Sequence, residues 1–212
     1  MESWWLLVPL LVVGYATYRR WQTKDPIAGL LYVENAINER RERELIKWIE
    51  SRPWTTAIVS NESGTDSTDR KVQHYGKEYV YTTRTLRDAA PIPDIFRELA
   101  AWLAIRADQI IVNKYEPGQG IAPHIDNLSL FGDTVSSLSL GSATAMEFTR
   151  GRDRREIILR PRSLLTLTGA ARYQWTHSIP RRKADAVNGR VWFRETRISI
   201  TFRTIKPQTI KH

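Results

Sequence analysis

Short alternations of apolar and polar residues dominate the chain from residue 109 onward, and they constrain its fold more than any other feature. A period of two is typical of β-strands that bury one face. Turn residues separate the segments at the spacing expected of a double-sheet β fold, either a sandwich or a jelly roll. Strands are predicted at residues 110–115, 135–140, 145–149, 156–160, 163–168, 174–179 and 197–203.

Two helical patterns precede these strands. The first opens at Asn38, carries Leu45 and Ile49 on its apolar face and stops before Pro53. The other predicted segments are a helix that begins at residues 91–94, strands at residues 29–32 and 80–83, and a polar loop at residues 60–69. The predicted fold class is therefore α+β, mainly β: a jelly roll with supporting N-terminal helices.

Composition narrows the chemistry that the chain can perform. Its 212 residues include no cysteine and four histidines, His74, His124, His177 and His212. The lack of thiols excludes disulfides, iron–sulfur clusters, thiolate zinc sites and a catalytic cysteine. The net charge of +9 favours polyanionic partners, either nucleic acid or an anionic membrane surface. The alternative is that the charge serves general solubility.

Residues 3–18 form an uncharged run near the N-terminus. As a helix, this run is short for a hydrocarbon core about 30 Å thick, but bilayer thinning or snorkelling can accommodate it. Arg19 and Arg20 follow it, so the positive-inside rule places the folded domain in the cytosol. We predict an apolar membrane-anchor helix over residues 1–21, then a linker over residues 22–28. A cleaved signal peptide and a buried or interfacial helix are the alternatives. The predicted location is the membrane, or otherwise the cytoplasm.

His124 and Asp126 stand two residues apart, so on a strand their side chains point to the same side. His177 lies on a later predicted strand that a jelly roll can bring opposite. Two histidines and one carboxylate form the facial triad of non-haem Fe(II) oxygenases. The His-x-Asp pattern alone is a weak signal, because isolated histidines are usually ordinary polar side chains. The prediction therefore depends on the rest of the site.

The strand at residues 197–203 alternates arginine, serine, threonine and arginine on one face with apolar side chains on the other. An inward polar row of this kind is costly unless an anion neutralises it, and a dicarboxylate gripped by a guanidinium would do so. The alternative is a two-faced strand whose polar side lies in water. The strand at residues 110–115 adds an amide and a phenol. The residues predicted for an anion site are Asn113, Tyr115, Arg197, Ser199, Thr201 and Arg203.

Taken together, these residues resemble the AlkB family of Fe(II)/2-oxoglutarate dioxygenases, which are built on a double-stranded β-helix. The resemblance covers residues 29–206, which leaves residues 207–212 as a tail. It is strongest to the tRNA wobble-uridine hydroxylases, whose animal members also carry an RNA-recognition motif and a methyltransferase domain. The segments that carry it are RKVQHYGKEYVY (70–81), NKYEPGQGIAPHIDN (113–127), VSSLSLGS (135–142) and RSLLTLTGAARYQWTHSI (162–179).

The resemblance implies that His124, Asp126 and His177 are the iron ligands and the catalytic centre. The implied reaction converts 2-oxoglutarate and O₂ into succinate and CO₂ and places one oxygen atom in a substrate C–H bond. A hydroxyl on an N-alkyl carbon collapses and releases an aldehyde, whereas a hydroxyl on a more stable carbon remains. The fold alone does not decide between these outcomes.

The resemblance also implies how the co-substrate binds. Arg197 and Tyr115 would hold the distal carboxylate of 2-oxoglutarate, and Asn113 and Arg203 would lie near the end that chelates iron. The expected cofactor is Fe(II), with 2-oxoglutarate and O₂ as co-substrates.

Two departures from the family pattern bear on the substrate. Lesion-repair members usually carry an acidic residue two positions after the aspartate ligand, where this chain has Leu128, which argues against repair of cationic alkylated bases. The wobble-uridine branch binds a structural zinc through cysteines, so no structural zinc is expected here. Because the RNA-recognition and methyltransferase domains are also missing, the domain itself or a separate tRNA-binding or methyltransferase partner would capture the substrate.

Residues 70–81 fall in the region that forms the nucleotide-recognition lid in AlkB relatives. Basic groups there can position phosphates, and aromatic faces can stack an unpaired base. The alternative is a polar strand pair that covers the core. The predicted substrate contacts are Arg70, Lys71, His74, Tyr75, Lys77 and Tyr79.

The predicted function is hydroxylation of a nucleic acid, preferably a modified wobble uridine in tRNA. The first alternative is oxidative demethylation that repairs alkylated bases in DNA or RNA. The others are a hydroxylase of protein or lipid, tethered to the membrane through residues 3–18, and a catalytically silent nucleic-acid-binding module.

Overall fold

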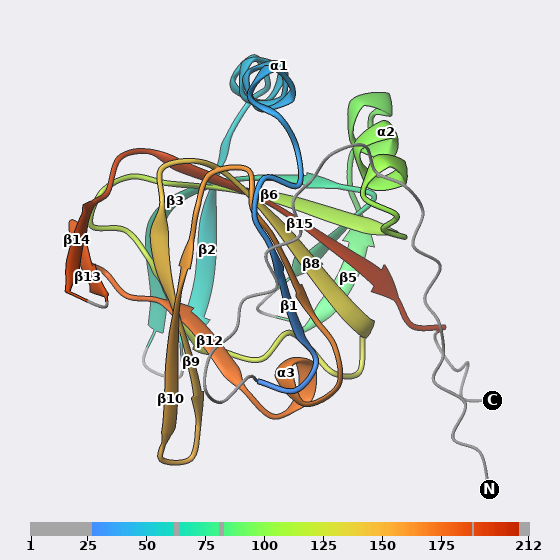
Figure 1. The fold of residues 1–212 in the computed structure, drawn as a ribbon. Coiled ribbons are helices and arrows are strands. Elements are labelled where there is room, and N and C mark those ends of the chain that lie inside the picture. The colour runs from blue at the N-terminus through green and yellow to red at the C-terminus, as the bar shows by residue number, and fades with distance from the viewer. Residues whose placement is uncertain (1–26, 62–63, 81–82, 188, 208–212) are drawn as a thin grey trace, which may run out of the picture.

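The computed structural model describes residues 27–61, 64–80, 83–187 and 189–207. Within these residues, two main sheets form the body of the protein (Figure 1). The larger sheet has seven strands in the order β1-β11-β8-β15-β6-β3-β2, and the smaller has four in the order β10-β9-β12-β7. Most neighbouring strands are distant in sequence and antiparallel, which is the arrangement of a jelly roll.

The described elements have the following bounds. The larger sheet contains β1 (Leu30–Val33), β2 (Thr55–Asn61), β3 (Gly64–Tyr75), β6 (Gln109–Tyr115), β8 (Phe131–Gly141), β11 (Leu164–Leu167) and β15 (Arg197–Ile205). The smaller contains β7 (Ile121–His124), β9 (Thr144–Arg150), β10 (Asp153–Leu159) and β12 (Thr176–Ile179). Two hairpins pair β4 (Lys77–Val80) with β5 (Thr85–Asp88), and β13 (Ala184–Val187) with β14 (Arg190–Phe193). The helices are α1 (Glu39–Glu50), α2 (Asp94–Trp102) and α3 (Gly169–Tyr173).

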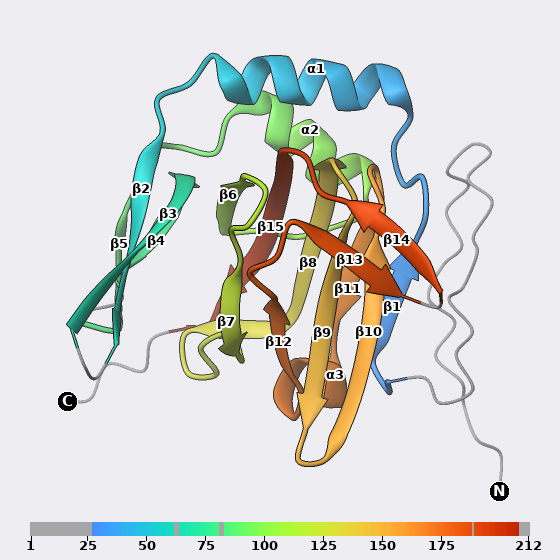
Figure 2. The same cartoon turned by 90° about the vertical axis from the view of Figure 1, so that its left-hand side faces the viewer.

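Helices α1 and α2 lie together on one side of the molecule (Figure 2). The N-cap of α1 is Asn38, whose Oδ1 accepts a hydrogen bond from the backbone N–H of Arg41 at 2.9 Å. Leu45 of α1 and Phe96 of α2 are fully buried in one core with Ile200 of β15. The helices therefore cover one face of the larger sheet and leave its other face to the smaller sheet.

Strand β15 shows how alternation divides these two faces. Ile198, Ile200 and Phe202 belong to the core beneath the helices. The polar residues between them face the opposite way, toward the smaller sheet, as the sequence pattern predicts. Pairing with β6 sets Arg197 opposite Tyr115.

Some elements differ from those predicted. The polar segment at residues 60–69, predicted as a loop, is largely strand: β2 continues to Asn61, and β3 begins at Gly64 in register with it. The edge of a sheet does not need an apolar face, because backbone hydrogen bonds alone can extend the ladder. The strand predicted at residues 80–83 lies earlier, because β4 ends at Val80. No prediction covered residues 55–59 of β2, nor β5, β7, β13, β14 and α3.

The predicted membrane anchor, residues 1–21, lies outside the described residues, as do most of the linker at residues 22–28 and of the tail at residues 207–212. No helix in the described part of the chain is long and apolar enough to cross a membrane. The division of the chain into anchor, linker, domain and tail stays a prediction.

Candidate active site

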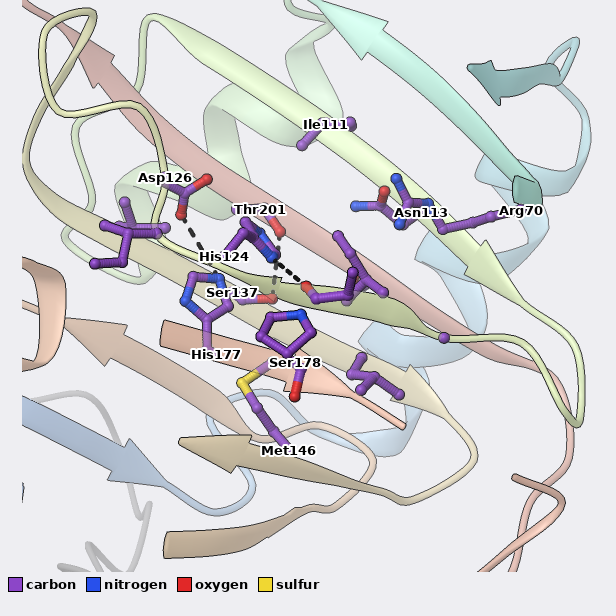
Figure 3. A pocket seen from close by; sticks show the side chains of 18 of the residues that line it. Arg70, Ile111, Asn113, His124, Asp126, Ser137, Met146, His177, Ser178 and Thr201 are labelled. Carbon is purple, nitrogen blue, oxygen red and sulfur yellow. Dashed lines mark hydrogen bonds and ion pairs between the residues drawn. The ribbon is translucent and has the colours of Figure 1, made fainter. Parts of the chain in front are cut away.

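Strands β7 and β12 bring two histidines face to face. His124 is the last residue of β7 and pairs in register with His177 of β12, and their ring centroids lie 4.3 Å apart. Asp126 follows the end of β7, and its Oδ2 lies 3.8 Å from His177 Nε2 (Figure 3). The structure therefore gathers the three predicted metal ligands. Asp126 arrives through a loop, not along the strand that the sequence spacing predicts.

The donor set of this trio fits a metal ion. His124 Nδ1 donates a hydrogen bond to the backbone carbonyl of Ala122 at 2.8 Å, so Nε2 is the nitrogen available to a metal. The 3.8 Å between His177 and Asp126 exceeds the distance of about 3 Å that separates adjacent ligands with bonds near 2.1 Å. Accordingly, no group of His, Cys, Asp and Glu in the described chain is already closed enough to hold an ion. The side chains are gathered, and a bound ion would draw His177 and Asp126 closer together.

Burial and neighbouring charges set the protonation of these ligands. Burial favours a raised pKa for Asp126, but Arg203 and the nearby imidazoles outweigh it and hold that pKa well below its ordinary value. Arg203 Nη2 donates to Asp126 Oδ1 at 2.6 Å, and Nη1 donates to Gln109 at 3.0 Å. Burial, with repulsion from His124, lowers the pKa of His177 to about 3. A carboxylate and a neutral imidazole are the forms that bind metals.

A buried arginine that was not predicted holds the loop that carries Asp126. Arg172 of α3 is 2% exposed. It donates to the backbone carbonyls of Asp126 at 2.8 Å, Asn127 at 3.2 Å and Gly132 at 3.2 Å. Charge-assisted bonds to these carbonyls fix the path of the loop. No periodic pattern marks Arg172, because α3 is a short helix between two strands.

The trio opens into a cavity of about 720 Å³ between the two sheets. Arg197 lines it, is 3% exposed and lies 5.4 Å from the centre of the Tyr115 ring. Its Nη2 donates to Ser139 Oγ at 2.9 Å, but its Nε and Nη1 are buried without a hydrogen-bond partner, as is Asn113 Oδ1. Burial lowers the pKa of Arg197 to about 10. A buried cation with unused donors fits the carboxylate of a bound co-substrate.

The remaining predicted co-substrate residues line the same cavity. Ser199 and Thr201 lie between the two arginines of β15, and the hydroxyl of Thr201 is 3.4 Å from that of Ser137. Gln109 also lines the cavity and was not predicted, although it shares a face of β6 with Asn113 and the alternation could have found it. The apolar walls of the cavity include Ile111, Ile121, Met146, Leu165, Leu167 and Ile179.

The six predicted substrate contacts divide into two groups. Arg70, His74 and Tyr79 line the cavity. Burial lowers the pKa of His74, and its Nδ1 is buried without a hydrogen-bond partner. The phenol of Tyr79 accepts a hydrogen bond from Asn127 Nδ2 at 3.4 Å. These three side chains lie where a substrate group could reach them.

Lys71, Tyr75 and Lys77 do not line this cavity, and their role as substrate contacts stays a prediction. Alternation along β3 turns Lys71 away, and its Nζ donates to Thr56 at 3.1 Å. The same alternation turns Tyr75 toward the helices, where its ring packs edge-on against Phe96 at 5.3 Å. Lys77 forms an ion pair across the β4–β5 hairpin. The sequence predicted substrate contacts throughout residues 70–81, but alternation along β3 turns only some of these side chains toward the cavity.

Comparison with known proteins supports the same chemistry. The sequence matches the 2OG-Fe(II) oxygenase superfamily over residues 29–203. It is 34% identical over 197 residues to the uncharacterized protein L905 of Acanthamoeba polyphaga mimivirus, covering 87% of this chain and 88% of that protein. It is 36% identical over 177 residues to the tRNA (carboxymethyluridine(34)-5-O)-methyltransferase ALKBH8 of Mus musculus. That match covers 78% of this chain and 26% of the mouse protein.

The fold has a counterpart among solved structures. The structure of OsALKBH1 matches with a TM-score of 0.66 at 17% identity, covering 86% of this chain and 99% of that chain. This likeness shows a shared fold and confirms the predicted jelly roll. The chain belongs to the 2OG-Fe(II) oxygenase superfamily and is an AlkB-like dioxygenase that uses Fe(II), 2-oxoglutarate and O₂.

Proposed function

We propose that this dioxygenase hydroxylates a nucleic acid, with a modified wobble uridine of tRNA as its preferred substrate. The observation that carries the proposal is the similarity to the mouse enzyme, whose name gives carboxymethyluridine at position 34 of tRNA as its substrate. The net charge of +9 supports a polyanionic partner. Tyr79, Arg84 and Arg181 in the lining of the cavity offer an aromatic face and cations to a nucleotide.

The proposed metal ligands are His124, Asp126 and His177, and bound Fe(II) would use electrons from 2-oxoglutarate to activate O₂ there. Arg172 holds the loop of Asp126, and His124 keeps its ring orientation through its bond to a backbone carbonyl. The apolar walls of the cavity exclude water from the reacting carbon. These residues position and shield the reaction.

We propose a co-substrate site that is continuous with this metal site. Arg197 and Tyr115 would grip the distal carboxylate of 2-oxoglutarate, since Arg197 has unused buried donors. Arg203, which bonds to Asp126, would lie near the end of 2-oxoglutarate that chelates iron. Asn113, predicted for the same end, pairs in register with Ser199, and both would line the path between the two ends.

The proposal includes a partner protein and a location in the cell. We propose that a separate tRNA-binding or methyltransferase protein assists in substrate capture, because the name of the mouse enzyme joins tRNA to a methyltransferase activity. We also propose a membrane location through residues 1–21, on the basis of the uncharged run at residues 3–18. Fractionation of cells that express the full chain, beside a chain lacking residues 1–21, tests this location.

The substrate proposal is tested by incubating the full chain with Fe(II), 2-oxoglutarate and either cellular tRNA or an unmodified transcript. We expect modified tRNA, and not the transcript, to stimulate succinate formation and to gain one oxygen atom at a wobble nucleoside. His124→Ala should abolish both signals. If no RNA stimulates turnover above the RNA-free rate, the tRNA proposal is wrong.

Oxidative demethylation of alkylated bases is a second candidate. The structure weakens the argument against it, which rested on Leu128. The sequence argued against repair because an acidic residue is missing there, but Leu128 is 45% exposed and lies outside the described lining of the cavity. The missing acid therefore carries little weight in this chain. Release of formaldehyde from oligonucleotides that contain 1-methyladenine or 3-methylcytosine would favour this candidate over stable hydroxylation.

A further inference from the structure

We propose that Arg70 forms a binding subsite for an oxyanion of the substrate, a phosphate or a carboxylate, at the junction of two cavities. The inference rests on the proposed nucleic-acid function and adds the chemistry that this part of the site recognises.

The side chain of Arg70 is buried with unused hydrogen-bond donors. Arg70 lies on β3 and is 1% exposed. Its Nε and Nη1 are buried and make no hydrogen bond. The guanidinium lies 5.5 Å from the centre of the Tyr115 ring, a contact that uses its charge but none of its donors. A buried guanidinium with unused donors is costly unless a ligand pairs with it.

The acidic side chains of the first cavity are already engaged. Asp126 accepts a hydrogen bond from Arg203 at 2.6 Å. Glu147 lies 3.5 Å from the guanidinium of Arg182. The described lining therefore provides no free carboxylate that could neutralise Arg70.

A second cavity of about 1010 Å³ meets the first at Arg70. It lies between α1, the β4–β5 hairpin and β3, and its size suits a nucleotide-sized group. On its helix side, the guanidinium of Arg52 stacks on the ring of Trp48 at 4.6 Å. Cations and aromatic rings are the groups that single-stranded nucleic-acid sites combine. The side chains that line both cavities are Arg70, His74, Tyr79 and Ile111.

Arg70 differs from the predicted co-substrate residue Arg197 in the cavities that it lines. Arg197 also lies over the Tyr115 ring, but it is absent from the described lining of the second cavity. A carboxylate can pair with two guanidinium groups, as Asp185 does with Arg182 and Arg194, so it is the opening of Arg70 to the second cavity that distinguishes it from Arg197. In Figure 3, Arg70 and Asn113 lie toward one end of the pocket and Asp126 toward the other. Arg70 is thus placed to meet an anion that enters from the second cavity.

The first test needs no turnover. Metal-free full chain is saturated with 2-oxoglutarate, and its thermal midpoint is measured with inorganic phosphate, acetate or chloride at equal ionic strength. We expect phosphate or acetate to raise the midpoint of the wild type and of the exposed control Arg43→Met, but not that of Arg70→Met. Without added oxyanion, Arg70→Met should be at least as stable as the wild type, because it removes a buried unpaired charge.

The second test uses turnover on modified tRNA. Arg70→Met should raise KM for RNA by about 10- to 100-fold, the loss expected for a charge-assisted hydrogen bond, and leave KM for 2-oxoglutarate unchanged. Arg70→Lys should recover part of the loss. The anion is identified with RNA that carries a single uncharged methylphosphonate beside the target. If wild type and Arg70→Met then have the same KM for this RNA, the anion is a phosphate. If the two proteins instead have the same KM for RNA whose base carboxylate is replaced by an uncharged amide, the anion is that carboxylate.

Two results would overturn the subsite. One is a raised KM for 2-oxoglutarate with an unchanged KM for RNA, which would assign Arg70 to the co-substrate. The other is equal oxyanion shifts in wild type and Arg70→Met. If no RNA is turned over but the oxyanion shift still depends on Arg70, the proposed RNA substrate fails and the subsite stands.

Discussion

At the scale of single residues, Arg197 is a buried cation in the cavity whose position follows from the sequence pattern. Alternation along β15 turns it inward, and burial removes it from water. Its position in the polar row could be predicted from the sequence because the row repeats every second residue. Arg172 could not, because an isolated arginine in a short helix carries no periodic signal.

Arg197→Lys should raise KM for 2-oxoglutarate by about 10- to 100-fold, since lysine keeps the charge but loses the planar fork that pairs with a carboxylate. Metal affinity should not change, because Arg197 does not contact the His–Asp–His trio. Steady-state kinetics and metal titration measure the two effects. Arg43→Lys, at a side chain 73% exposed on α1, is the matched control. An unchanged KM would remove Arg197 from the co-substrate site.

The lowered pKa of His177 predicts how the metal-free protein responds to acid. Its folded-state pKa of about 3 lies below the ordinary value of 6.5, so between these values the unfolded chain binds more protons. The contribution to stability is therefore complete above pH 6.5 and is lost as pH falls toward 3. Between pH 7 and 5 the loss is about 2 kcal/mol.

Thermal or urea unfolding across this pH range, for wild type and His177→Gln, measures the contribution of His177. The wild type should lose more stability than the variant on acidification. Parallel curves would contradict a buried neutral His177.

At the scale of elements, the pairing of β7 with β12 places His124 opposite His177. Strand β7 was not predicted, because its sequence, Ile-Ala-Pro-His, does not alternate and contains a proline. The longer strands β6, β8 and β15 were predicted close to their observed positions. The part of the β2–β3 hairpin at residues 60–69 was predicted as a loop, since its Ser, Thr, Asp and Gly residues also signal turns.

Gly120 provides a test of this pairing, because a Cβ there would lie 2.1 Å from the carbonyl oxygen of Ile179. Gly120→Ala should push β7 away from β12, separate the two histidines and lower metal affinity at least 10-fold. The control is Gly151→Ala at the β9–β10 turn, where a Cβ meets nothing within 4 Å. Its positive φ of 59° should cost only about 1 kcal/mol, without an effect on metal binding. Equal metal affinity in the two variants would contradict this role of the strand pairing.

At the scale of the whole molecule, the site depends on contacts between segments that are far apart in sequence. The polar faces of β6 and β15 come from the larger sheet, whereas the two histidines come from the smaller sheet. Spacing and alternation show which side chains share a strand face, but not which strands become neighbours. The resemblance to the AlkB family supplied that second step, because the family fold fixes the order of the strands.

The central claim is that this chain transfers oxygen from O₂ to a nucleoside while it oxidises 2-oxoglutarate. The most direct test is mass spectrometry of nucleosides and succinate after incubation of modified tRNA, Fe(II) and 2-oxoglutarate under ¹⁸O₂. We expect one labelled oxygen in succinate and one in the product nucleoside, with both absent for His124→Ala. Labelled succinate without label in any nucleoside, and without release of formaldehyde, would contradict the claim that nucleic acid is the substrate.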